Sequence, residues 1–70
     1  MERQKVQSSN IASIGYDQSA NILEIEFLDG GIYQYSGVSE GIYDNLMSAR
    51  SHGGYFSSFI KDRYNYRRIR

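Results

Sequence analysis

The final third of the chain combines aromatic and basic side chains, and both types contribute to the binding of single-stranded nucleic acid. Aromatic rings stack on bases, and cations next to them neutralise phosphates. Tyr64 and Tyr66 stand among basic residues in this way. The sequence therefore predicts a nucleic-acid-binding surface, with Arg50, Lys61, Arg63, Tyr64, Tyr66, Arg67, Arg68 and Arg70 as its candidate residues.

Charge is divided unevenly along a chain whose formal net charge is zero. Residues 1–48 contain two basic and seven acidic residues, whereas residues 49–70 contain six basic residues and Asp62 alone. An asymmetry of this kind indicates either an anionic partner for the basic third or pairing between the two halves of the chain. The sequence leaves both interpretations open.

The chain offers little of what catalysis requires. General acid–base chemistry needs a base held close to a nucleophile, or two carboxylates with separated pKa values. His52 is the one histidine, and it lies beside Ser51 and two glycines. A lone histidine in a polar turn is more typical of a solvated residue or of one that caps a helix end. We therefore expect no catalytic residue and no enzymatic activity.

Metal and cofactor sites are not expected either. The chain has no cysteine, which excludes a disulfide framework and a thiolate-ligated metal. Glu24 and Glu26 are two residues apart on one face of a predicted strand, and such a pair could bind a cation. No further acidic residue joins them in the sequence, so we expect them on a solvated outer face of a sheet.

A β-hairpin over residues 23–36 is the element around which the chain is organised. Apolar and polar residues alternate on both sides of Asp29, Gly30 and Gly31, which is the pattern of two strands joined by a tight turn. A two-residue loop would place Tyr33 and Tyr35 on the face of the two glutamates. The loop length therefore decides what these tyrosines contact.

A three-residue loop gives the hairpin one apolar face. It would pair Phe27 with Tyr33 and Ile25 with Tyr35, and Gly31 could adopt the left-handed conformation that ends such a loop. We expect this register. Tyr33 and Tyr35 could still stack on bases, but a 70-residue domain needs aromatic bulk in its core, and alternation favours the core for both. Tyr64 and Tyr66 remain open between the two roles.

Another strand is predicted before the hairpin, over residues 10–16. Alternation places Ala12, Ile14 and Tyr16 on its buried face and Ile11 on the opposite face. Residues 1–9 are polar, so we expect a flexible N-terminus there and a single domain over residues 10–70.

Two helices are predicted after the hairpin, because the apolar period changes from two to about 3.6 beyond Gly37. Ser39 is the natural N-cap of the first helix. Ser51 or Gly53 could cap a shorter second helix that continues through Ile60. We expect both helices to pack on the apolar face of the sheet.

The predicted fold class is α+β: a three-stranded antiparallel meander with two short helices on one face. The segment of residues 61–70 allows a short C-terminal edge strand as well. No run approaches the roughly 18 apolar residues of a membrane span, and the N-terminus lacks the apolar segment of a signal peptide. We therefore expect a soluble, cytoplasmic protein without a membrane partner.

Several short motifs occur together along residues 10–70. They are Ile14-Gly15-Tyr16-Asp17, the strand with Leu23, Ile25 and Phe27, Tyr33-Gln34-Tyr35, Gly37-Val38, and Ser51, Gly53, Tyr55 and Phe56 followed by Ile60. This combination resembles the KTSC domain family, which is named for a C-terminal extension of some lysyl-tRNA synthetases and also occurs as a free-standing bacterial protein. A proline often follows the family's Gly-Val, and here Ser39 takes that position.

The resemblance implies a link to RNA, because the domain is attached to some tRNA synthetases. Our leading hypothesis is a nonenzymatic accessory module that binds RNA, either tRNA or a single strand, through the basic and aromatic residues of the final third. The alternative is a protein-interaction module that uses an exposed sheet edge or the acidic face of the sheet.

Overall fold

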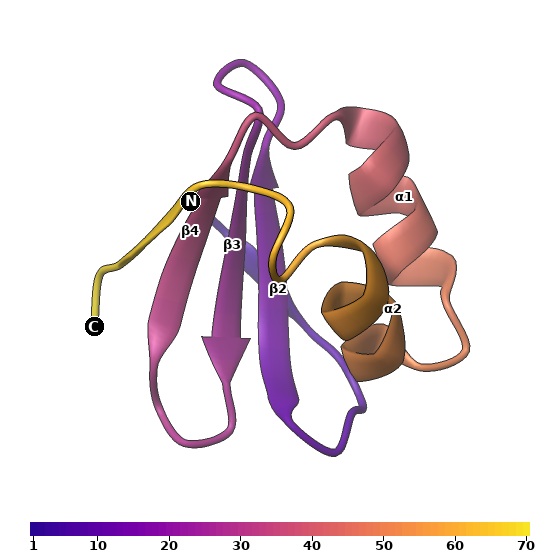
Figure 1. Cartoon of the computed structure of the whole chain (residues 1–70). Helices are drawn as coiled ribbons and strands as arrows, with labels where there is room; N and C mark the ends of the chain where they lie inside the picture. The colour runs from indigo at the N-terminus through magenta and orange to yellow at the C-terminus, as the bar shows by residue number, and fades with distance from the viewer.

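Alternating apolar and polar residues build one antiparallel sheet in the computed structural model, which describes residues 1–70, and two helices cover one of its faces (Figure 1). The sheet has five strands, in the order β1-β2-β3-β4-β5. The elements are β1 (Arg3–Lys5), β2 (Ile11–Asp17), β3 (Ile22–Phe27), β4 (Ile32–Ser36), α1 (Glu40–Ser48), α2 (His52–Phe59) and β5 (Tyr66–Arg68). The α+β class is confirmed. The predicted three-stranded meander omitted β1, whereas the short C-terminal edge strand that the sequence allowed over residues 61–70 is present as β5.

The loop between β3 and β4 has three residues, as predicted, but it lies one residue earlier. The N–H of Phe27 donates to the carbonyl of Gly31 at 2.8 Å, and the N–H of Gly30 donates to the carbonyl of Phe27 at 2.9 Å. Gly30 has a φ of 97° and so takes the left-handed position that we assigned to Gly31. The carboxylate of Asp29 accepts the N–H of Gly31 at 2.9 Å, which stabilises the loop at this place.

The predicted strand pairs are consequently wrong by two residues. Ile25 pairs with Tyr33, and Leu23 pairs with Tyr35. Because side chains alternate with a period of two, a shift of two residues leaves every side chain on its predicted face. Tyr33 and Tyr35 therefore lie on the apolar face, as the sequence indicated.

A bulge in β2 corrects a second prediction. Ile11 pairs with Phe27 and Ser13 pairs with Glu26, so Ala12 is an extra residue on its strand. The bulge turns Ile11 toward the same face as Ile14, and both side chains are fully buried. The prediction that Ile11 faces away from the core was wrong, because strict alternation does not hold across a bulge.

The N-terminal segment contributes β1 to the sheet, although we predicted that residues 1–9 would be flexible. Arg3 pairs with Gly15 of β2. A Cβ atom at Gly15 would lie 2.8 Å from the carbonyl oxygen of Glu2 and 2.9 Å from Cγ of Arg3. Glycine thus allows β1 to approach β2, a contact that local sequence in residues 1–9 does not reveal.

Serine side chains cap both helices. The hydroxyl of Ser39 accepts the N–H of Ile42 at 3.3 Å, and the hydroxyl of Ser51 accepts the N–H of Gly54 at 2.9 Å. Ser39 was the predicted cap of α1, and of the two candidates for α2 the structure uses Ser51. Neither α1 nor α2 has the length and apolar composition to cross a bilayer.

The core lies between the helices and the apolar face of the sheet. Two of its members, Leu46 and Phe56, come from the helices and are almost completely buried. Replacing a core residue of this size by alanine typically costs about 2–5 kcal/mol. The cluster comprises Ile11, Ile14, Leu23, Ile25, Tyr35, Val38, Leu46, Phe56 and Ile60.

We expect Gly15→Ala to destabilise the domain by roughly 1–3 kcal/mol, because its methyl group would push β1 away from β2. Chemical denaturation should measure the loss, and hydrogen exchange should show faster exchange of the amides of β1. Gly41→Ala is the matched control, since the nearest atom to its added Cβ is Ser39 Oγ at 3.9 Å. Because alanine favours a helix over glycine by roughly 0.5–1 kcal/mol, the control should be slightly stabilising. Equal effects of the two substitutions would contradict this account of Gly15.

Tyr35 should make the fold sensitive to alkali. Burial, followed by the nearby Tyr33, Tyr66 and Asp62, raises the pKa of Tyr35 from its ordinary value near 10 to about 12. The folded state therefore favours the neutral phenol. This stabilisation is fully present below the pKa of the unfolded chain and is lost as the pH rises from about 10 through about 12.

Tyr35→Phe keeps the ring but cannot ionise at this position. We expect its melting temperature to fall less steeply than that of the wild type between pH 10 and 12. Thermal melts across this range provide the measurement. Parallel curves for the two proteins would show that ionisation of Tyr35 does not contribute.

Candidate nucleic-acid interface

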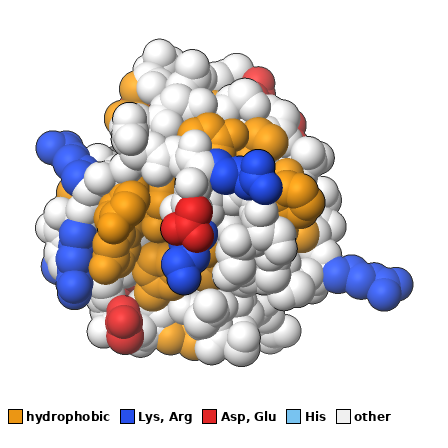
Figure 2. Space-filling view, viewed as in Figure 1, with side chains coloured by type: hydrophobic (Ala, Val, Ile, Leu, Met, Phe, Trp, Pro, Cys, Tyr) orange, Lys and Arg blue, Asp and Glu red, His pale blue; other side chains and the backbone are white.

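A groove of about 320 Å³ opens on the helix-covered side of the sheet, where α2 ends and the aromatic residues of β4 and β5 remain uncovered. Phe27, Tyr33, Tyr35, Phe56 and Tyr66 supply its aromatic lining, while polar residues complete its border. Figure 2 shows hydrophobic side chains gathered on this face, with acidic and basic side chains beside them. The groove thus combines ring surfaces with charge.

The aromatic rings of the groove contact one another but differ in exposure. The ring of Tyr66 lies 5.7 Å from that of Tyr33 and 5.5 Å from that of Tyr35, measured between centroids. Tyr35 is 4% exposed and belongs to the core, as predicted, whereas Tyr33 is half-buried and Tyr66 is 59% exposed. Tyr33 and Tyr66 therefore present ring surface to a ligand, and Tyr35 supports them from below.

Strand β5 brings part of the predicted site to the groove through its register with β4. Tyr66 pairs with Tyr35, and Arg68 pairs with Tyr33. The guanidinium carbon of Arg68 lies 5.7 Å from the centroid of the Tyr33 ring, within the range of a cation–π contact. Because alternate residues of a strand share a face, Tyr66 and Arg68 lie together on the aromatic side.

The same alternation sends Arg67 to the opposite face of the sheet. Its guanidinium donates to Oε1 of Gln34 at 3.4 Å. Arg70 also lies on this side, where its guanidinium is 3.3 Å from a carboxylate oxygen of Glu26. The prediction grouped Arg67 and Arg70 with Arg68 in one surface, and the structure separates them from it.

The outer face is a network of paired charges, not the solvated acidic surface that we expected. Glu24 is only 4% exposed, forms an ion pair with Arg3, and accepts a hydrogen bond from the amide of Gln34 at 2.8 Å. Burial alone would raise the pKa of Glu24. The hydrogen bonds from Gln34 and Arg3, together with the charge of Arg3, outweigh burial and leave this pKa below its usual value.

Glu26 belongs to the same network. One of its carboxylate oxygens accepts the hydroxyl of Ser13 at 2.8 Å, and the other meets Arg70. The guanidinium of Arg3 also donates to that hydroxyl, at 3.0 Å. Polar side chains therefore link β1, β2, β3 and the C-terminal segment on this face. No cluster of three potential metal ligands occurs in the chain.

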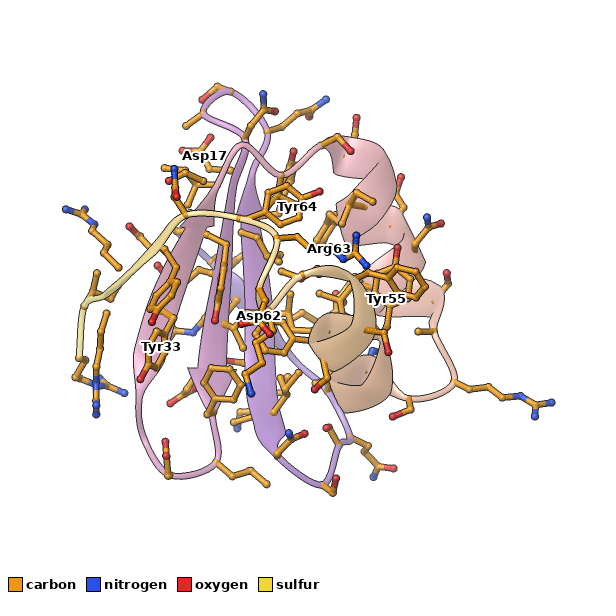
Figure 3. The ribbon with its side chains drawn as sticks, in the orientation of Figure 1. Asp17, Tyr33, Tyr55, Asp62, Arg63 and Tyr64 are labelled. Carbon is orange, nitrogen blue, oxygen red and sulfur yellow. The ribbon has the colours of Figure 1, made fainter.

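Three further predicted residues lie outside the groove. Arg50 is exposed in the segment between the two helices. Arg63 donates to the carbonyl of Ser58 in α2 at 3.3 Å, and Figure 3 shows it on the helix side of the view, away from Tyr33. Tyr64 is half-buried and packs against the core. Of the two roles left open for Tyr64, the structure therefore favours packing.

Lys61 and Asp62 line the groove from the turn that follows α2. Both side chains are exposed, and neither forms an ion pair or a side-chain hydrogen bond within the chain. In Figure 3, Asp62 lies on the side of α2 that faces the strands. Lys61 was a predicted site residue, whereas Asp62 was missed. Its one signal in the sequence is that it is the single acid in a basic segment.

His52 has a structural role, one of the two noncatalytic roles that the sequence indicated. It is the first residue of α2, and its Nδ1 lies 2.8 Å from the carbonyl oxygen of Leu46. Since a carbonyl oxygen only accepts, Nδ1 carries the hydrogen and caps the C-terminal end of α1.

Comparison with known proteins agrees with the resemblance seen in the motifs. The KTSC domain profile matches residues 7–64. The crystal structure of a KTSC domain protein from Yersinia pestis superposes with a TM-score of 0.96 and is 48% identical, covering 99% of this chain and 97% of that one. An uncharacterized protein of Stutzerimonas stutzeri is 40% identical over 99% of both chains.

A lysine–tRNA ligase of Nostoc punctiforme is also similar, with 32% identity over 93% of this chain. The match covers 12% of that enzyme, so the resemblance concerns one small segment of it. Because the family profile spans most of the sequence and the Yersinia pestis structure shares the whole fold, the chain belongs to the KTSC domain family.

Proposed function

We propose that the protein is a nonenzymatic module that binds single-stranded RNA in the groove between α2 and β5. The observation that carries this proposal is the meeting of two exposed ring surfaces, Tyr33 and Tyr66, with two cations, Lys61 and Arg68, on one face. Each component has a direct counterpart in a single strand. Rings stack on bases whatever their sequence, and cations meet the phosphates between them.

The free energies expected from base stacking and from cation–phosphate contacts are those of a weak, salt-dependent interaction. Stacking on an aromatic side chain contributes about 1–3 kcal/mol per base. The domain also has cations at the groove that no carboxylate side chain neutralises, because Arg70 is the one basic residue of the final third that pairs with an acidic side chain. Arg68 donates only to the main-chain oxygen of Arg70, at 3.0 Å. Most basic residues of the final third therefore form no ion pair with the acidic part of the chain. Their positive charges remain available to an anionic ligand.

The relation to the Nostoc punctiforme enzyme supports RNA as the ligand class. A segment similar to this chain is part of a protein whose name states that it joins lysine to tRNA. An RNA-binding module would serve such an enzyme by adding contacts to its nucleic-acid substrate. Single-stranded regions, including those of tRNA, are the RNA features whose bases are free to stack on protein rings.

We expect binding to weaken with salt through two phosphate contacts. Each contact releases counterions and contributes about −0.7 to the slope of log affinity against log salt, so Lys61 and Arg68 together predict a slope of about −1.4. Arg68→Glu should lower affinity and flatten this slope. Arg67→Glu is the matched control, because the neighbouring side chain lies on the other face of the sheet. Fluorescence anisotropy with a labelled uridine oligonucleotide measures both quantities.

A ring substitution separates stacking from charge. Tyr66→Leu should weaken binding by about 1–3 kcal/mol with the salt slope unchanged, since it removes a stacking surface and no charge. Tyr66→Phe retains the ring and should bind like the wild type. If Tyr66→Leu bound as tightly as Tyr66→Phe, the ring would not contact a base.

Protein interaction is the competing hypothesis. Its acidic-face version is weakened, because Glu24 is buried and ion-paired. Its edge version would use β1 or β5, each of three residues, as a template for a partner strand. If the wild-type protein bound neither RNA nor single-stranded DNA at low ionic strength, the RNA proposal would fail and an edge interaction would become the better explanation.

A further inference from the structure

Resting on the RNA-binding function proposed above, we infer that the groove selects guanine through Asp62 and Lys61. The carboxylate of Asp62 would accept the two neighbouring N–H groups of the guanine Watson–Crick edge, at N1 and N2. With guanine in the groove, the ammonium group of Lys61 would donate to O6 instead of to the phosphate that it meets on a uridine strand. Tyr33 and Tyr66 would supply the aromatic surface on which the base lies.

The first argument is that neither Asp62 nor Lys61 has an ion-pair partner within the chain. The two carboxylates of β3, Glu24 and Glu26, are each satisfied by an arginine and by a further hydrogen bond. Asp62 and Lys61 are adjacent in sequence and line the same groove, yet they do not pair with each other. A second carboxylate in the lining, Asp29, already accepts the N–H of Gly31 at 2.9 Å. Asp62 and Lys61 are thus the charged acceptor and the charged donor of the groove that have no partner within the chain.

The chemistry of the bases provides the second argument. A carboxylate has two acceptor oxygens and binds best to two parallel donors. Guanine alone offers two adjacent N–H donors on its Watson–Crick edge, with a carbonyl acceptor beside them. Adenine and cytosine would place a ring nitrogen lone pair against the carboxylate, and uracil has one N–H between two carbonyls. Asp62 would therefore favour guanine and disfavour the other three bases.

The size of the groove is compatible with one base. Its volume of about 320 Å³ lies at the lower end of the range of about 300–1,000 Å³ for small-molecule sites. The aromatic lining gives the base an apolar contact, while Asp62 and Lys61 stand at the border, accessible from solvent. One guanine in the groove would leave the flanking phosphates near Arg68.

The test compares labelled uridine oligonucleotides that carry one central guanosine, inosine, adenosine or cytidine, with the all-uridine strand as reference. We expect the guanosine strand to bind about tenfold more tightly than the all-uridine strand, as for a bidentate base contact. Inosine lacks the N2 amino group and should fall between them. Fluorescence anisotropy at constant low salt gives the affinities.

Asp62→Asn should abolish the guanosine preference, because an amide offers one acceptor and places a donor where the second acceptor was. The all-uridine strand should still bind to this variant. Asp44→Asn, on the exposed surface of α1, removes the same charge and should keep the preference. The side chain of Asp62 makes no hydrogen bond and no ion pair within the chain, so the melting temperature of the Asp62→Asn variant should equal that of the wild type.

The outcomes separate the two proposals. If the wild type binds all strands equally, or prefers another base, or if Asp62→Asn retains the guanosine preference, the guanine inference is overturned while RNA binding stands. If no strand binds, both proposals fail.

Discussion

The alternation of side chains along a strand is the constraint on which this structure depends. Successive side chains point to opposite faces, so each strand contributes to the core on one side and to a polar network on the other. In β5 this constraint places Tyr66 and Arg68 beside the groove and Arg67 between them on the outer face. Tyr66, Arg67 and Arg68 were all predicted to bind nucleic acid, yet they belong to two different surfaces.

On the outer face, the sheet face opposite the helices, the buried carboxylate of Glu24 is neutralised by neighbouring side chains. Glu24 is almost inaccessible to solvent, and an unpaired charge in such a place would cost several kcal/mol. Arg3 supplies the opposite charge and Gln34 a hydrogen bond, so the same contacts that neutralise Glu24 also attach β1 to the sheet. Arg3 and Arg70 are the two basic residues that form ion pairs with this face, and Lys61 and Arg68 form none.

The groove exists because α1 and α2 leave part of the aromatic face uncovered beside β4 and β5 (Figure 1). Phe56 of α2 reaches the sheet and packs edge-on against Tyr35, with 5.3 Å between the ring centroids. Beyond this contact the rings of Tyr33 and Tyr66 remain partly accessible to solvent, and Asp62 and Lys61 lie in the turn after the helix. Aromatic residues of the sheet therefore serve the core at one end of the face and a candidate binding surface at the other.

The sequence by itself determined the fold class, the cap Ser39, and the face of Tyr33 and Tyr35, because period and capping chemistry are local properties. The choice of Ser51 over Gly53 as the cap of α2 came from the structure. Only the tertiary structure decided the register of the hairpin, since a shift of two residues leaves the alternation unchanged. It also decided which charges meet. Arg3 reaches Glu24 and Arg70 reaches Glu26 across the assembled sheet, while Asp62 gains its place opposite Tyr33 only after α2 has packed. Such contacts join residues far apart in the chain, and no local pattern records them.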